Sequence, residues 1–204
     1  MELFTLFPQP VSRLKLEKTE KYKKLFIPKL TKEFNEHPEK CWDWGTNSHC
    51  WFERIKTMPK ELGEDISGAV TQWMQYFGFP DAKWDLTAWW NVYAWNMYQD
   101  THNHIGNEHG QNVISGIYYL QLPKHAKPAI FTNQNTPYYS ILNRTGTYIK
   151  HPFFECFSAG VESFQQREGD LMMFTPDQNH LAPRSSQKHD DLRITLSFNV
   201  TLKN

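Results

Sequence analysis

The sequence has few cysteines and no excess of charge of either sign. Its three cysteines, Cys41, Cys50 and Cys156, are an odd number without CxxC spacing, which argues against both a disulfide framework and a zinc knuckle. Lys and Arg together number 22, as do Asp and Glu. Because the chain therefore has no global field to hold a phosphate backbone, we expect no nucleic-acid partner.

Long apolar runs are also missing. No window reaches the roughly eighteen uninterrupted apolar residues of a membrane span, and the opening Met1-Glu2-Leu3-Phe4 lacks the basic and apolar regions of a secretory signal. We expect a cytoplasmic protein with no membrane partner, whose cysteines are thiols.

Length and composition favour one domain. With 204 residues, 39% apolar and 15% aromatic, the chain can build one substantial core. We predict a single domain over 1–204, in which residues 1–83 supply a strand and supporting helices and residues 84–204 form the β core.

The N-terminal part combines one edge strand with two helices. Residues 3–16 are apolar but carry two prolines, which suits an edge strand or a broken one. Apolar residues at three- and four-residue steps predict a helix over 19–37, and a cleaner one from Pro59 to Gly78. Between them, 38–58 is interpreted as a loop with aromatic anchors.

From Trp84 onward the apolar period changes to two, which predicts a β system. In the last segment every second residue is apolar, and the other face is polar, including Arg193, Thr195, Ser197 and Asn199. That polar face suits either a half-exposed strand or a barrel with a wet interior. The predicted strands are 84–98, 112–122, 128–132, 147–157, 170–175 and 191–202.

Three histidines form a candidate metal site. His102 and His104 are two residues apart, so on a strand both would project to the same face. His180 follows a turn and an apolar run, which would place it at a strand end. Three neutral imidazoles could bind iron, zinc or copper and leave open coordination positions, although nine histidines in the chain make a two-apart pair unremarkable alone.

Arg193 lies thirteen residues after His180, on the polar face of the last strand and two residues before Thr195. A guanidinium can hold a carboxylate through two parallel hydrogen bonds, and a neighbouring hydroxyl can add a third donor. Arg193 is therefore a candidate receptor for the distal carboxylate of a keto-diacid whose other end chelates the metal.

Several motifs follow one another over nearly the whole chain. They are Leu6-Phe7-Pro8-Gln9-Pro10-Val11, Trp90-Asn91-Val92-Tyr93, His102-Asn103-His104, Ser115-Gly116-Ile117-Tyr118-Tyr119-Leu120, Gly169-Asp170-Leu171 with Phe174 and Pro176, His180, and Arg193-Ile194-Thr195-Leu196-Ser197-Phe198-Asn199. In this order they resemble the motifs of the 2-oxoglutarate- and Fe(II)-dependent oxygenases common in marine bacteria and their phages, in the prolyl-hydroxylase-like superfamily. The resemblance implies a double-stranded β-helix, a jelly-roll type barrel, with supporting helices.

The resemblance implies His102 and His180 as iron ligands and Arg193 as the 2-oxoglutarate anchor. Thr195 or a tyrosine, Tyr118 or Tyr119, would assist Arg193.

The chain departs from the broader superfamily at His104, where that superfamily has a carboxylate. A neutral ligand there should weaken Fe(II) binding without forbidding it. We favour His102, His104 and His180 as the ligands. An alternative register makes His104 the first ligand and puts Gly106 in a vacant carboxylate position, and Asp100 is a further ligand candidate with unsuitable spacing.

The implied reaction uses Fe(II), 2-oxoglutarate and O2 and releases succinate and CO2 while a C–H bond is hydroxylated; halogenation and desaturation stay open. Asn91 and Asn199, on polar strand faces, could order the ligands or the oxo acid. The substrate is an unidentified peptide or small molecule, with peptidyl hydroxylation favoured by analogy. A polar segment over 132–147 is the expected place for substrate contacts.

Two other function classes remain. A cupin-like metalloenzyme that does not use 2-oxoglutarate would need the three histidines but not Arg193. A β-sandwich binding module would leave the histidines without metal and its aromatic side chains exposed. The dense aromatic residues of 84–98 are interpreted mainly as core, and the sequence carries no signal for an oligomeric state.

Overall fold

The computed structural model describes residues 9–43, 49–105, 112–132 and 166–203. They contain two antiparallel sheets and two α-helices. The larger sheet has seven strands in the spatial order β1 (Val11–Lys15), β8 (Asp170–Phe174), β6 (Asn112–Gln121), β10 (Arg193–Leu202), β4 (Trp84–Tyr93), β3 (His49–Arg54) and β2 (Cys41–Asp43). The smaller sheet has three, β5 (Gln99–His102), β9 (His180–Ala182) and β7 (Ile130–Phe131).

Strand β10 holds the centre of the larger sheet. It pairs along its full length with β4, from Arg193 opposite Tyr93 to Leu202 opposite Trp84, and on its other side with β6. Its first eight residues are all buried. The alternating sequence is therefore not that of a half-exposed strand: the apolar face meets a core and the polar face is covered as well.

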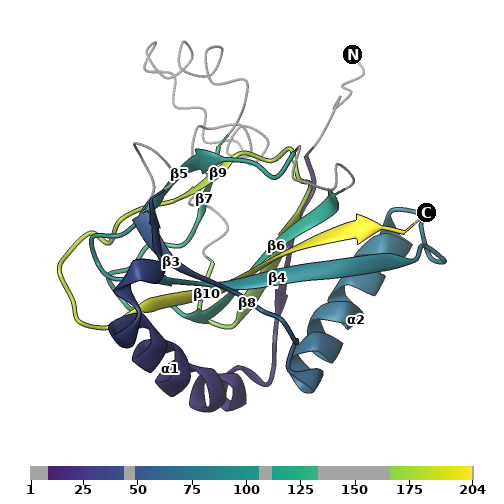
Figure 1. Ribbon diagram of the computed structural model, residues 1–204. Helices are drawn as coiled ribbons and strands as arrows, with labels where there is room; N and C mark the ends of the chain where they lie inside the picture. Colours follow the sequence, from purple (N-terminus) through teal and green to yellow (C-terminus); the bar gives the residue numbers. More distant parts are fainter. Residues whose placement is uncertain (1–8, 44–48, 106–111, 133–165, 204) are drawn as a thin grey trace, which may run out of the picture.

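The helices cover one face of the larger sheet (Figure 1). Helix α1 spans Thr19–Glu36 and helix α2 spans Lys60–Tyr76. The apolar positions of α2, such as Ile66 and Val70, are fully buried in one cluster with alternate residues of β10, such as Leu196. Both helix predictions are confirmed, because in each case one apolar stripe faces the sheet.

Gly116 is required by close packing within the sheet. It lies opposite Phe198 on β10, and a Cβ atom at Gly116 would stand 2.2 Å from the Phe198 ring. Because Gly116 has no side chain, the Phe198 ring can pack against the backbone of β6 in the core.

Two expectations for the N-terminal half have different outcomes. The edge strand predicted within 3–16 is confirmed over Val11–Lys15, since β1 lies at one margin of the larger sheet. Residues 3–8 of that segment lie outside the described residues. The interpretation of 38–58 as a loop is wrong: the segment contains a short 3-10 helix, η1 (Pro38–Lys40), and both β2 and β3. The missed signal is the alternation from Trp51, fully buried among core residues, to Phe52 and Arg54 on the other face.

Of the strands predicted in the second half, 84–98 proves shorter, because β4 ends at Tyr93 and a turn leads to β5. The strand predicted over 147–157 lies outside the described residues.

The smaller sheet lies across from the larger one, on the side away from the helices (Figure 1). Two facing antiparallel sheets, with the helices outside, form the double-stranded β-helix expected for this chain. No helix among the described residues has the length and apolar character needed to span a membrane.

Candidate metal centre

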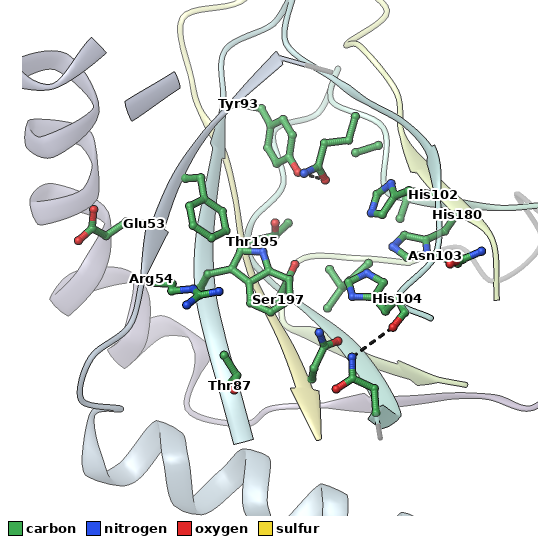
Figure 2. A pocket seen from close by; sticks show the side chains of 18 of the residues that line it. Glu53, Arg54, Thr87, Tyr93, His102, Asn103, His104, His180, Thr195 and Ser197 are labelled. Carbon is green, nitrogen blue, oxygen red and sulfur yellow. Dashed lines mark hydrogen bonds between the residues drawn. The ribbon is translucent and has the colours of Figure 1, made fainter. Parts of the chain in front are cut away.

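A cavity of about 740 Å³ lies between the two sheets. The polar face of β10 lines one wall through Arg193, Thr195, Ser197 and Asn199, and the histidines stand on the other wall. Figure 2 shows His102, His104 and His180 grouped across the cavity from Thr195 and Ser197. Of the two interpretations of the polar face, the structure supports the wet interior.

The three predicted histidines come together. His102 ends β5 and His180 begins β9, and the two are cross-strand partners with ring centroids 4.4 Å apart. The ring of His104 lies 5.5 Å from that of His102 and 5.2 Å from that of His180. One ligand nitrogen from each residue lies within 4.8 Å of the others, so one ion could contact all three.

The reason for this convergence differs from the one predicted. His104 does not share a strand with His102, because β5 ends at His102. Its backbone N–H donates to the Pro176 carbonyl over 2.8 Å, and its own carbonyl accepts from the Asn112 side chain over 3.2 Å. These bonds, and not the two-residue period of a strand, bring His104 to the site.

Backbone carbonyls orient two of the rings. Nδ1 of His102 lies 2.7 Å from the Asp100 carbonyl, and Nδ1 of His180 lies 3.0 Å from the Gln178 carbonyl. Because a carbonyl only accepts, each Nδ1 carries the proton and donates, which leaves Nε2 with a lone pair. Both rings are thus held in the tautomer that coordinates a metal through Nε2.

Burial keeps the imidazoles neutral. It lowers the pKa of His102, and it lowers the pKa of His104 to about 4, where the neighbouring His102 adds to the effect. The pKa of His180 falls well below its ordinary value, first through burial and then through the two other histidines. Neutral imidazoles are the form in which histidine binds metal ions.

His104 sits in a largely aromatic environment. Its ring stacks on Trp89 with centroids 6.0 Å apart and meets Phe174 edge-on at 6.5 Å. Its Nδ1 is buried and makes no hydrogen bond with any residue that the structure describes. A buried polar atom without a partner is costly. A metal ion coordinated by this nitrogen would remove the cost, so the donor set fits an iron ion.

Arg193 lines the cavity from β10, and its side chain is almost fully buried. Its guanidinium carbon lies 3.8 Å above the centre of the Tyr93 ring, and Nη1 donates to the carbonyls of Lys127 and Pro183 over 2.8 and 3.2 Å. These contacts fix the cation in one orientation at the cavity wall. A buried, fixed guanidinium fits the carboxylate of a dicarboxylic co-substrate.

Of the two candidate tyrosines, only Tyr119 lines the cavity. Its hydroxyl donates to Gln166 Oε1 and accepts from the Ala129 backbone N–H. Tyr118 points the opposite way, and its hydroxyl bonds to Thr19 on α1 over 3.0 Å. Tyr118 is therefore a core residue, and the prediction that it could help Arg193 is wrong.

Hydrogen bonds also order the polar side chains between Arg193 and the histidines. The Asn91 amide donates to Ser197 Oγ over 2.9 Å, and Ser115 Oγ donates to Asn199 Oδ1 over 2.8 Å. Thr195 lies next to Asn91 in the strand register. Asn91 and Asn199 are buried and paired across strands, so they order the cavity wall instead of capping strand ends.

The comparisons with known proteins agree with this geometry. The model of the 2OG-Fe(II) oxygenase family matches residues 87–199, which is more than half of the chain. The chain belongs to this family. Among curated proteins, none matches the sequence significantly.

Solved structures give the same fold. The chain is similar to a prolyl-4-hydroxylase from Pseudomonas putida at 12% identity, with a TM-score of 0.61, covering 96% of this chain and 94% of that one. It also resembles the viral collagen prolyl hydroxylase of Paramecium Bursaria Chlorella virus-1 at 10% identity and a TM-score of 0.56, with 93% and 94% covered. The carbocyclase SnoK from nogalamycin biosynthesis matches at 10% identity with a TM-score of 0.60, covering 95% of this chain and 79% of that one.

Family membership decides between the function classes that the sequence leaves open. This oxygenase is an enzyme that uses Fe(II), 2-oxoglutarate and O2, and its three clustered histidines could bind the iron. The cupin-like enzyme without 2-oxoglutarate and the binding module are both overturned by the match.

The remaining sequence candidates have separate outcomes. Asp100 is exposed and lies outside the ligand cluster; it contributes its backbone carbonyl to His102. Gly106, on which the alternative register depends, lies outside the described residues, as does nearly all of the 132–147 segment.

Sequence reasoning missed several cavity residues. Tyr93 and Trp89 belong to the aromatic run interpreted mainly as core, yet both line the cavity, whereas Trp90 is a core residue as expected. Their alternation within β4 was a usable signal. Arg54 was missed because β3 itself was not predicted.

Proposed function

We propose that this oxygenase binds Fe(II) through His102, His104 and His180 and 2-oxoglutarate through Arg193, and that it hydroxylates a C–H bond of a peptide or small molecule. One observation carries the proposal: a cluster of three neutral imidazoles and a buried, fixed guanidinium line the same cavity. Thr195, which lines the cavity beside Arg193, would add a hydroxyl donor to the co-substrate carboxylate. Tyr119 lines the same cavity and would serve as a second donor only by giving up its hydrogen bond to Gln166 Oε1.

When bound, Fe(II) and 2-oxoglutarate supply the oxidising chemistry, with O2 consumed and succinate and CO2 released. The protein's own contribution is binding and order. The Asp100 and Gln178 carbonyls hold two imidazoles in the metal-binding tautomer. Tyr93 and two backbone carbonyls hold Arg193 in place before the co-substrate arrives, which lowers the entropic cost of binding.

The ligand set has a consequence for affinity. Three imidazoles are neutral, whereas two imidazoles and a carboxylate carry one negative charge. We expect Fe(II) to bind more weakly here than at a site with a carboxylate ligand, and softer or later divalent metals to compete.

Peptidyl hydroxylation is the favoured activity. Two of the structural relatives are named as prolyl hydroxylases, although SnoK is named as a carbocyclase. At 10–12% identity these relatives support the fold, and the substrate class is our proposal. The core shared by α1, α2 and the larger sheet supports a single domain over 1–204.

The test is an anaerobic titration of the protein with Fe(II) and 2-oxoglutarate, followed through the weak visible metal-to-ligand charge-transfer band. The wild type should develop the band. Arg193→Ala should need a co-substrate concentration about tenfold or more higher, because a charged hydrogen-bonded pair is lost. Lys60→Gln, on the exposed side of α2, is the matched control and should titrate like the wild type.

Two results would contradict the proposal. A folded, iron-loaded wild type that shows no band does not chelate 2-oxoglutarate at its metal. An unchanged titration of Arg193→Ala would mean that another group receives the carboxylate.

A further inference from the structure

The cavity continues beyond the histidines, away from Arg193. Residues of β3 and β4 line this part, together with the far end of β10. Figure 2 shows Arg54 and Thr87 on the wall that faces the three histidines from across the cavity. Its lining residues include Arg54, Lys56, Thr87 and Trp89.

The strand register places Arg54 relative to the proposed co-substrate site. Arg54 lies opposite Trp89, and Trp89 lies opposite Ser197. Ser197 is four residues from Arg193 along β10, which corresponds to about 13 Å at the usual rise of a strand. Arg54 and Arg193 therefore belong to different rows of the same wall, four residues apart along the strand direction.

The row that holds Arg54 is close to the metal ligands. Trp89, its neighbour in this row, stacks on His104 with ring centroids 6.0 Å apart. A molecule in contact with Arg54 and the Trp89 ring would thus lie beside the candidate metal centre.

This part of the cavity has more positive than negative charge: Arg54 and Lys56 line it, and the carboxylate of Glu53 beside them is paired with Lys40. Arg54 and Lys56 are exposed and make no ion pair with any residue that the structure describes. Glu53, between them and the helices, is bound to Lys40 over 2.8 Å, and its carboxylate points away from the histidines (Figure 2). The imidazoles, being neutral, add no charge.

From this arrangement we propose that the prime substrate carries an anionic group, a carboxylate or a phosphate, which Arg54 binds with the help of Lys56. The inference rests on the proposed function and names the substrate class of that same site. Arg54 can bind either group through two parallel hydrogen bonds, and Lys56 adds a second positive charge. The anion then fixes how far the reacting carbon lies from the metal, so Arg54 selects the substrate and positions it.

The test measures anion binding with the co-substrate site already filled. The anaerobic Fe(II) protein, saturated with 2-oxoglutarate, is titrated by calorimetry with inorganic phosphate, N-acetylglutamate and the neutral N-acetylglutaminamide, in which amides replace both carboxylates. The first two probes distinguish phosphate from carboxylate, and the third measures binding that does not depend on charge. The variants are Arg54→Gln, Arg54→Lys and Lys56→Gln, with Lys60→Gln as the control outside the cavity.

We expect the wild type to bind at least one anionic probe and to bind N-acetylglutaminamide about tenfold more weakly or worse. Arg54→Gln should weaken anion binding about tenfold, Arg54→Lys less, and Lys56→Gln about threefold, while the charge-transfer titration with 2-oxoglutarate stays unchanged. Lys60→Gln should behave as the wild type.

The inference is overturned if the wild type binds neither anion, if the neutral probe binds equally well, or if Arg54→Gln has no effect. It is also overturned if Arg54→Gln weakens 2-oxoglutarate and not the probes, since Arg54 would then serve the co-substrate. These failures differ from failure of the proposed function, in which the wild type would show no charge-transfer band at all.

Discussion

The two faces of the larger sheet are built from the same strands and are buried to a similar degree, yet they differ in kind. On β10, Leu196 and Phe198 are fully buried against the helix side, while Ser197 and Asn199 are 8% and 7% exposed on the cavity side. The first face removes apolar surface from water, which stabilises the fold. The second buries polar atoms, which costs free energy wherever a hydrogen bond is missing.

Cross-strand hydrogen bonds reduce that cost on the cavity face. Asn91 bonds to Ser197, and Ser115 bonds to Asn199. His104 Nδ1 is an atom for which the described residues provide no such bond. A buried position on this sheet therefore belongs either to the apolar core or to the cavity wall, and burial alone does not distinguish the two. One face is organised for stability and the other for binding, and substitutions should separate the two properties.

The largest effect is expected on the cavity face, at His180. His180→Ala removes one of three candidate ligands and should abolish stoichiometric Fe(II) binding and 2-oxoglutarate turnover. The fold should persist, because the ring lies in the cavity wall and not in the helix-packed core. Metal analysis after dialysis measures the loss of iron binding, and circular dichroism checks that the fold persists. An iron content equal to that of the wild type would contradict the ligand assignment.

On the helix face, a substitution at Leu196 should reduce stability and leave co-substrate binding unchanged. Leu196→Ala should lower the free energy of unfolding by about 2–5 kcal/mol through lost apolar contacts and a cavity. In the folded protein, KM for 2-oxoglutarate should equal that of the wild type, because Leu196 faces away from Arg193 and the histidines. Urea denaturation and steady-state assays at low temperature test this. A large change in KM would show that the two faces are coupled.

A smaller loss of stability is expected at Gly116, which lies opposite Phe198 on the helix face. The Cβ of Gly116→Ala would collide with the Phe198 ring, so the ring or the strand must move, at about 1–3 kcal/mol. The double variant Gly116→Ala with Phe198→Leu should recover part of this loss, since the smaller side chain gives way. A single variant as stable as the wild type would contradict the packing argument.

The sequence could predict the helix face well and the cavity face only in part. The apolar periods of α2 and β10 predict both elements because each buries a single stripe or face. Arg193 and Thr195 could be assigned to the polar face from alternation alone. Whether that face met water or a cavity depends on the second sheet, whose strands are only two to four residues long and carry little pattern.

The details of the metal centre depend on contacts between distant segments. His102 and His180 meet through a β5–β9 pairing, and His104 is held by Pro176 and Asn112. No local period encodes these contacts. Tyr118 and Tyr119 illustrate the same limit: adjacent strand residues face opposite sides, and the sequence did not say which one lines the cavity.

The smallest expected effect is a dependence of the free energy of unfolding on pH, which should come from the cavity face and not from the helix face. The pKa of His104 is about 4 in the folded protein, against about 6.5 for an unperturbed histidine. Between these values the unfolded chain binds a proton that the folded, metal-free protein does not. The free energy of unfolding should therefore fall as the pH drops from about 6.5 towards 4, and stay level with respect to this group above 6.5. By about pH 5 the loss should be about 1 kcal/mol or more.

Urea denaturation of the metal-free protein near pH 7 and near pH 5 measures this slope. His104→Gln should reduce it but not remove it, because burial also lowers the pKa of His102 and of His180. Leu196→Ala should keep the wild-type slope at a lower overall stability, because the helix face holds no buried histidine among the described residues. If His104→Gln keeps the full slope, the proton uptake belongs to other groups, and the buried, neutral state of His104 would have to be abandoned.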